Sequence, residues 1–188
     1  LHFCRHLSRD FFDLVVDRAN RPQPDLIAVT GDIIDDRQRL PWFAECLGRL
    51  SSRYGTYCIF GNHELRIRDT ELLVRAVQEA RLHYVGRRWH EVKIRGHAVL
   101  LAGNELPWLG PAPELSGCPP VRGKDPPFRI LLSHSPDQFA WARRGDFDLM
   151  LAGHTHGGQI RLPVIGALVG ESRYGVKYCG SLYYHRPT

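Results

Sequence analysis

The stretch Asp25–Asp32, "DLIAVTGD", decides the fold of this chain. The residues from Leu26 to Thr30 form an uncharged, mostly apolar run, which is typical of a β-strand buried on both faces. Gly31 then allows the backbone to turn sharply, and Asp32 follows at the point where the strand ends. Because a strand buried on both faces needs helices or a second sheet to cover it, the stretch predicts an α/β fold.

The segments on either side of this strand alternate between helical and strand patterns. Ser8 is placed to cap the first helix, whose apolar residues recur at helical spacing. The later strands are short, which indicates that part of the sheet structure is antiparallel or mixed. The predicted helices are 8–20, 40–50, 70–80 and 136–143, and the predicted strands are 26–30, 56–60, 90–94, 98–102, 128–134 and 148–152.

The length and composition predict one globular domain. The chain has 188 residues, 43% of them hydrophobic, which is enough for a sizeable core, and we expect residues 1–188 to form a single domain. The chain begins at Leu1 without a methionine, so we expect truncation at the N-terminus, and "YHRPT" (184–188) is either a C-terminal truncation or a divergent end.

No apolar stretch approaches the roughly 20 residues that cross a bilayer, and no signal peptide opens the chain. We therefore favour a cytoplasmic or membrane-peripheral location, with any targeting or anchor segment upstream.

The net charge is +5 and the pI is near 9.1, which favours anionic partners. The arginines are dispersed, however, so a solvated basic surface is the simpler interpretation. The five cysteines show no CxxC spacing, which argues against a disulfide scaffold and against a cysteine-based zinc site.

Four predicted strands end in side chains that bind metals. In α/β folds, ligands gather at the carboxyl ends of strands, so we expect these side chains to meet. In "GHTHGGQ" (153–159) the two histidines are one residue apart, and on an extended segment both rings lie on one face. His2 lies near the N-terminus and could join them. The strand-end residues are Asp32, Asn62, His63, His134, His154 and His156.

Taken singly, these motifs have simpler interpretations. "GD" is more often a turn than a ligand, and His134 after a buried strand could be a core histidine. Together they predict a metal site. Imidazole, carboxylate and amide donors without thiolates suit Mn, Fe, Zn, Co or Ni.

The donors are too many for one tetrahedral zinc, so we expect two divalent ions about 3.5–4 Å apart, bridged by a carboxylate. Such a pair activates a water for attack on phosphorus, and the leaving group then needs a proton donor.

The motifs "GDIID" (31–35), "GNHE" (61–64), "SHSP" (133–136) and "GHTH" (153–156) resemble those of the calcineurin-like metallophosphoesterase superfamily. They span nearly the whole chain in the order of that family. The longer form "GHTHGGQIRLP" is similar to a bacterial branch that includes phosphodiesterases and a UDP-diacylglucosamine pyrophosphatase. The resemblance implies a four-layer α/β/β/α sandwich of two mixed sheets, with the metals at the carboxyl ends of the strands.

The resemblance also implies roles, with manganese as the favoured metal. Its first motif is Asp-x-His, so its aspartate would sit one position before Leu1. His63 resembles the histidine that contacts the substrate phosphate and protonates the leaving group. Asp32 resembles the carboxylate that bridges both ions, with Asn62, His134 and His154 on one ion and His2 and His156 on the other.

The function that follows is dinuclear metal-dependent hydrolysis of a phosphoester or pyrophosphate bond. The expected substrate is a small or lipid-linked phosphodiester. One alternative is a catalytically weak metal-binding scaffold that recruits partners. Another is a nucleic-acid phosphodiesterase, which we rank lower because no basic cluster is interleaved with aromatic residues. The oligomeric state is open.

Some neighbouring residues receive plainer interpretations. Asp35 is expected to hydrogen-bond locally, and Glu64 to orient its loop or face solvent. Asn104 and Glu105 could line the rim of the site, but an ordinary turn is the favoured interpretation. The apolar segment 160–170, "IRLPVIGALVG", could meet an acyl chain or make peripheral membrane contact, but a buried hairpin is the favoured interpretation.

Overall fold

The computed structural model describes residues 1–185 and has the predicted α/β order. The predicted chain end at 184–188 therefore lies mostly outside the described residues. The α-helices are α1 (Arg9–Asn20), α2 (Pro41–Glu45), α3 (Thr70–Glu79) and α4 (Phe139–Arg144). The strands are β1 (Ile27–Thr30), β2 (Thr56–Ile59), β3 (His83–Tyr84), β4 (Trp89–Ile94), β5 (His97–Asn104), β6 (Phe128–Ser133), β7 (Leu149–Ala152), β8 (Ile160–Leu162) and β9 (Gly166–Val169).

The strands form two larger sheets and one hairpin. The four-stranded sheet has the order β4-β5-β6-β7 and is mixed, since β4 and β5 are antiparallel and the other pairs are parallel. The three-stranded sheet has the order β1-β2-β3, and its described strands pair only in parallel, unlike the mixed pairing expected for it. Helical connections explain this difference, because a chain that crosses over through a helix returns in the same direction. Strands β8 and β9 form the separate hairpin.

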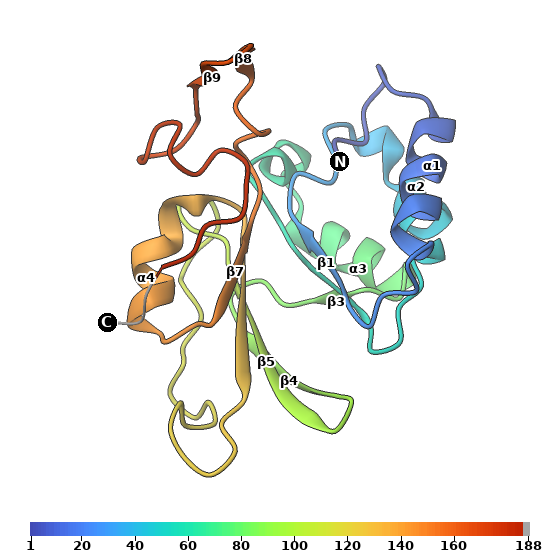
Figure 1. Cartoon of the computed structure of the whole chain (residues 1–188). Coiled ribbons are helices and arrows are strands. Elements are labelled where there is room, and N and C mark those ends of the chain that lie inside the picture. Colours follow the sequence, from blue (N-terminus) through green and yellow to red (C-terminus); the bar gives the residue numbers. More distant parts are fainter. Residues whose placement is uncertain (186–188) are drawn as a thin grey trace.

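The strand β2 is buried on both faces, as its uninterrupted apolar run predicts. Successive side chains of a strand point to opposite faces. Cys58 and Phe60 accordingly join a core that includes residues of α1, α2 and α3, whereas Tyr57 and Ile59 join a second core. Figure 1 shows α1 and α3 on the side of the three-stranded sheet.

The second core contains residues of both larger sheets. Val99 and Leu101 of β5 belong to it, together with Leu132 of β6. The intervening residue Leu100 points the other way, into a third core with Ala142 of α4. Figure 1 shows α4 on the side of the four-stranded sheet, away from α1 and α3. The two sheets therefore share one core, and each has another on its other face.

Two predicted segments differ in the structure. The helix predicted over 40–50 stops at Glu45 and continues as a 3-10 turn over Leu47–Arg49. This turn contains Gly48, and glycine in a helix interior costs about 1 kcal/mol relative to alanine. The segment 160–170 is an exposed hairpin, so its interpretation as a buried one is wrong.

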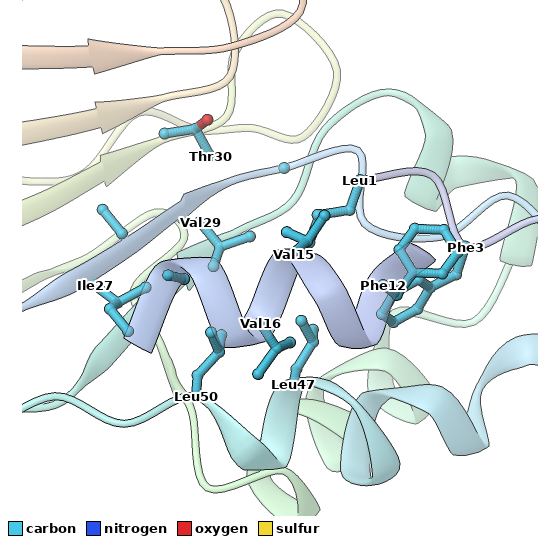
Figure 2. Close-up of a pocket in the computed structure, with 13 residues that line it drawn as sticks. Leu1, Phe3, Phe12, Val15, Val16, Ile27, Val29, Thr30, Leu47 and Leu50 are labelled. Atoms are coloured by element: carbon cyan, nitrogen blue, oxygen red, sulfur yellow. The ribbon is translucent and has the colours of Figure 1, made fainter. Parts of the chain in front are cut away.

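An apolar groove of about 270 Å³ lies between α1 and β1, the edge strand of the three-stranded sheet (Figure 2). Leu1, Val15 and Val29 are among the side chains that line it. Residues 1–3 continue beside the loop that follows β1, where the backbone N–H of His2 donates to the carbonyl of Asp32 at 2.8 Å. This pairing holds His2 close to the carboxyl end of β1.

The ordinary turn expected at Asn104 and Glu105 is wrong, because Asn104 is the last residue of β5 and both residues are fully buried. The Glu105 carboxylate accepts hydrogen bonds from the Phe60 N–H at 2.7 Å and the Tyr84 hydroxyl at 2.8 Å. Arg87 Nε lies 3.7 Å away. Burial, which outweighs these favourable contacts, raises the pKa of Glu105 to about 7. The expected value for an exposed glutamate is 4.5.

This raised pKa predicts a measurable dependence of stability on pH. Between pH 4.5 and about 7 the folded state holds a proton on Glu105 that the unfolded state has lost. The contribution of Glu105 to the free energy of unfolding is therefore highest below pH 4.5 and falls by up to ~3 kcal/mol by pH 7. In Glu105→Gln this fall should disappear in chemical denaturation across that range. The exposed Glu91→Gln is the control, and an unchanged slope in Glu105→Gln would contradict the assignment.

Candidate active site

The predicted site residues meet at the carboxyl ends of β1, β2, β6 and β7. Their donor atoms fall into three groups, and within each group the atoms lie within 4.8 Å of one another. Two of the groups share Asp32. The groups are His2, Asp32 and His156; Asp32, His134 and His154; and His2, Asp35 and His63.

The buried imidazole of His134 has its two nitrogens in different surroundings. Nδ1 lies 2.7 Å from the carbonyl oxygen of Thr30, which only accepts, so Nδ1 carries a proton. Nε2 then presents a lone pair to the amide oxygen of Asn62 at 3.0 Å and to Asp32 Oδ1 at 3.2 Å. Three acceptors facing one another repel unless a cation or a proton lies between them. A histidine that binds a metal through one ring nitrogen usually donates the N–H of the other to a carbonyl or carboxylate, as His134 does here.

His2 repeats the pattern on the other side of Asp32. Its Nδ1 lies 3.2 Å from Asp35 Oδ1, so this nitrogen donates its proton to the carboxylate. Its Nε2 faces His156 Nε2 at 3.2 Å and Asp32 Oδ2 at 3.7 Å. The two sets of lone pairs therefore converge on opposite oxygens of one carboxylate.

His63 lies at the same edge of the site. Its Nδ1 is hydrogen-bonded to Asp35, and its Nε2 is 4.0 Å from Asp32 Oδ2. Its backbone N–H donates to Asp32 Oδ1 at 3.0 Å. Asp35 thus orients the rings of both His2 and His63, which is the local hydrogen bonding expected for it but places it directly behind the site.

The electrostatics favour the forms that bind cations. Burial works against the ionised form of Asp32, but its contacts, among them the hydrogen bond from the backbone N–H of His63, outweigh burial and hold the pKa of Asp32 well below its usual range. Burial lowers the pKa of His2 and of His154, so both imidazoles are neutral at neutral pH. Metals bind neutral imidazole and ionised carboxylate.

The backbone is left-handed at four of the predicted ligands. The φ angle is +59° at His2, +50° at Asp32, +68° at His154 and +51° at His156. This region is uncommon for residues other than glycine, and such residues cluster at functional sites. Gly61 is needed for a different reason, since a Cβ there would lie 2.5 Å from Asp32 Oδ1.

Glu64 holds the loops of the site together, although the sequence left its role open. Its side chain is buried. Its carboxylate accepts hydrogen bonds from four backbone N–H groups, those of Asp32, Ile33, Ile34 and Gly61, at 2.5–3.0 Å. The loop after β1 is thereby fixed to the loop after β2, although burial raises the pKa of Glu64.

The variant Glu64→Leu is expected to lose much of its stability. It leaves four buried N–H donors without a partner, and each such donor costs about 1–3 kcal/mol. We expect the free energy of unfolding to fall by more than ~4 kcal/mol. Urea denaturation followed by circular dichroism measures this change. Glu71→Leu, at an exposed position on α3, is the matched control, and equal stability of the two variants would refute the role of Glu64.

Trp108 is a further residue that sequence reasoning missed. Its ring centroid lies 4.6 Å from that of His154 and 5.1 Å from that of His134. It belongs to the Pro- and Gly-rich stretch 107–127, where local sequence indicates only a surface loop. The loop therefore places the Trp108 ring against His134 and His154, two of the predicted ligands.

Residues 1–158 match the family described as Calcineurin-like phosphoesterase, and the chain belongs to this family. This match confirms the family inferred from the motifs. Members of the family are phosphoester hydrolases that use divalent metal ions. The chain is 28% identical to Phosphodiesterase YaeI of Escherichia coli (strain K12), with 93% of this chain and 65% of that protein covered. It is 32% identical to the uncharacterized metallophosphoesterase YkuE of Bacillus subtilis (strain 168), with 95% and 64% covered.

A third relative is a Bos taurus protein named transmembrane protein with metallophosphoesterase domain. It is 32% identical over 85% of this chain and 39% of its own length. The chain thus spans about two thirds or less of the length of these relatives. No solved structure matches the chain. Among the helices of residues 1–185, none is both long and apolar enough to cross a membrane.

Proposed function

We propose that the protein hydrolyses a phosphodiester or pyrophosphate bond with two divalent metal ions held at the strand ends. The observation behind this proposal is the convergence of imidazole nitrogens of His2 and His134 on the two oxygens of Asp32. We further propose that residues 1–188 form one domain with the α/β/β/α sandwich of the family. The core shared by the two sheets and the helices on their other faces support this layering.

The donor set fits the two ions. Asp32 would bridge them, because it is the carboxylate common to two of the groups. The ions would supply an activated water and neutralise charge on the phosphoryl oxygens. The donors suit Mn, Fe, Zn, Co or Ni, and manganese is favoured. One ion would be held by Asn62, His134 and His154, and the other by His2 and His156.

The chain's own residues would then orient the substrate and move a proton. Because Asp35 accepts the Nδ1 proton of His63, it fixes the ring with Nε2 toward the site. A protonated His63 Nε2 can therefore donate to the oxygen of the leaving group. Trp108 would limit the space beside His154 and exclude water from that side.

The substrate is proposed to be a small or lipid-linked phosphodiester. The name of the Escherichia coli relative includes phosphodiesterase, and the positive net charge of this chain favours an anionic substrate. A nucleic-acid strand is a weaker candidate, because binding it requires stacked aromatic residues along a basic groove. A binding scaffold without catalysis is disfavoured by the intact hydrogen bond between His63 and Asp35.

Hydrolysis of bis-p-nitrophenyl phosphate tests the proposal. The protein is freed of metal by a chelator and assayed with each of the five metals in turn, with ion content measured by elemental analysis. We expect turnover that depends on added metal and reaches its maximum near two ions per chain. Two bound ions without any turnover would instead support the scaffold, and absence of bound metal would refute the site.

A further inference from the structure

The hairpin of β8 and β9 is an apolar projection with little packing of its own. Val164 at its tip is fully exposed, and Ile165 and Ile160 are 69% and 55% exposed. Figure 1 shows the hairpin standing out from the rest of the molecule. Within residues 1–185, no residue of the hairpin belongs to any of the three cores. Exposed apolar surface of this kind marks an interaction site.

The hairpin is fastened to the loop that contains two of the proposed ligands. Gly158 lies so close to β9 that a Cβ on it would be 2.3 Å from the Cβ of Ala167. Arg161 Nη1 donates to the carbonyl of Gly157 at 2.5 Å. Because Gly157 directly follows His156, the base of the hairpin is joined to the loop that contains His154 and His156.

The segment that contains the hairpin is basic overall. Residues 157–184 contain three basic side chains and one acidic side chain, that of Glu171. An exposed apolar tip in a segment with a basic balance suits a surface with anionic lipid headgroups. The three basic residues, Arg161, Arg173 and Lys177, are all exposed.

We propose that this hairpin docks the protein on a lipid surface that contains anionic headgroups, with Val164 and Ile165 entering the apolar boundary. A projecting apolar tip suits a bilayer, because such a tip can enter the boundary between headgroups and acyl chains. This inference rests on the proposed function and extends it. Docking would bring the protein to a membrane that contains a lipid-linked phosphodiester.

Vesicle flotation tests the docking. The protein is mixed with phosphatidylcholine vesicles, with and without about one third anionic phosphatidylglycerol. We expect it to float with the anionic vesicles and to be released by salt. Replacing both tip residues, Val164→Asp and Ile165→Asp, should lower the bound fraction at least 10-fold. Leu14→Asp on α1 is the control, because Leu14 is an equally apolar, exposed side chain outside the hairpin.

The outcomes separate docking from catalysis. Hydrolysis of the soluble diester should be unchanged in the tip variant, so loss of flotation with normal turnover supports the proposal. Failure of the wild-type protein to float with either vesicle overturns it, and so does a tip variant that still floats. If size-exclusion chromatography shows a dimer that the tip substitutions dissociate, a second copy covers the hairpin and lipid docking is refuted. An inactive protein that floats refutes only the proposed hydrolysis.

Discussion

Replacing His63 by alanine is expected to lower turnover of a phosphodiester by about 10²–10⁴-fold while both metal ions stay bound, the usual loss for a proton-transfer group. The structure gives the reason. His63 Nδ1 is held by Asp35, and Nε2 is directed toward the shared carboxylate without a hydrogen-bond partner among residues 1–185. Removal of the ring therefore takes away the proton donor but none of the donors proposed for the metals.

The measurement pairs turnover with elemental analysis of the same sample. His97→Ala is the matched control, because His97 is exposed on β5. A second variant, Asp35→Asn, should lose less activity and should change the pH profile, since the amide no longer fixes the proton on Nδ1. Loss of one ion in His63→Ala would show that His63 is a ligand with His2 and Asp35. Full turnover would remove His63 from the mechanism.

Asp32→Asn is expected to empty both metal positions together. The variant keeps the shape of the side chain and can keep the hydrogen bond from the His63 N–H. It loses the negative charge that the contacts of Asp32 stabilise. A neutral amide cannot bridge two cations as a carboxylate does, and metal-ion stabilisation supplies several kcal/mol to the transition state. We expect turnover to fall more than ~10³-fold.

Metal titration by isothermal calorimetry measures this effect directly. Asp125→Asn, at an exposed loop position, serves as the control. Asp32→Asn is compared with Asn62→Ala, which should weaken the binding of only one of the two ions. Retention of two tight ions in Asp32→Asn would refute the bridge.

The sequence predicts the strands and their ends better than it predicts what joins them. A run of residues without charge, such as 56–60, predicts a strand buried on both faces from its own composition, whichever strands lie beside it. The side chains that follow the strands converge by a general rule of α/β folds, so Asn62 and His134 could be placed in advance. Which strands pair, and the two-residue strand β3, depend on contacts distant in sequence.

The errors at Glu105 and at the hairpin have opposite physical causes. Glutamate is charged and usually exposed, so Glu105 looks like a turn residue until the folded chain supplies a buried backbone donor for it. The opposite error occurred at the hairpin, where an apolar segment predicts burial although no core lies nearby. The left-handed backbone at Asp32 has only one local signal, the glycine before it.

The groove beside β1 has a consequence for how samples of this protein behave. Among residues 1–185, no strand pairs with the outer border of β1, and the hollow next to that border is lined by apolar side chains. An extended peptide can pair with such an unpaired strand edge through backbone hydrogen bonds. Dynamic light scattering across a dilution series should therefore show growth with concentration, and added short peptides of alternating apolar pattern should compete with it.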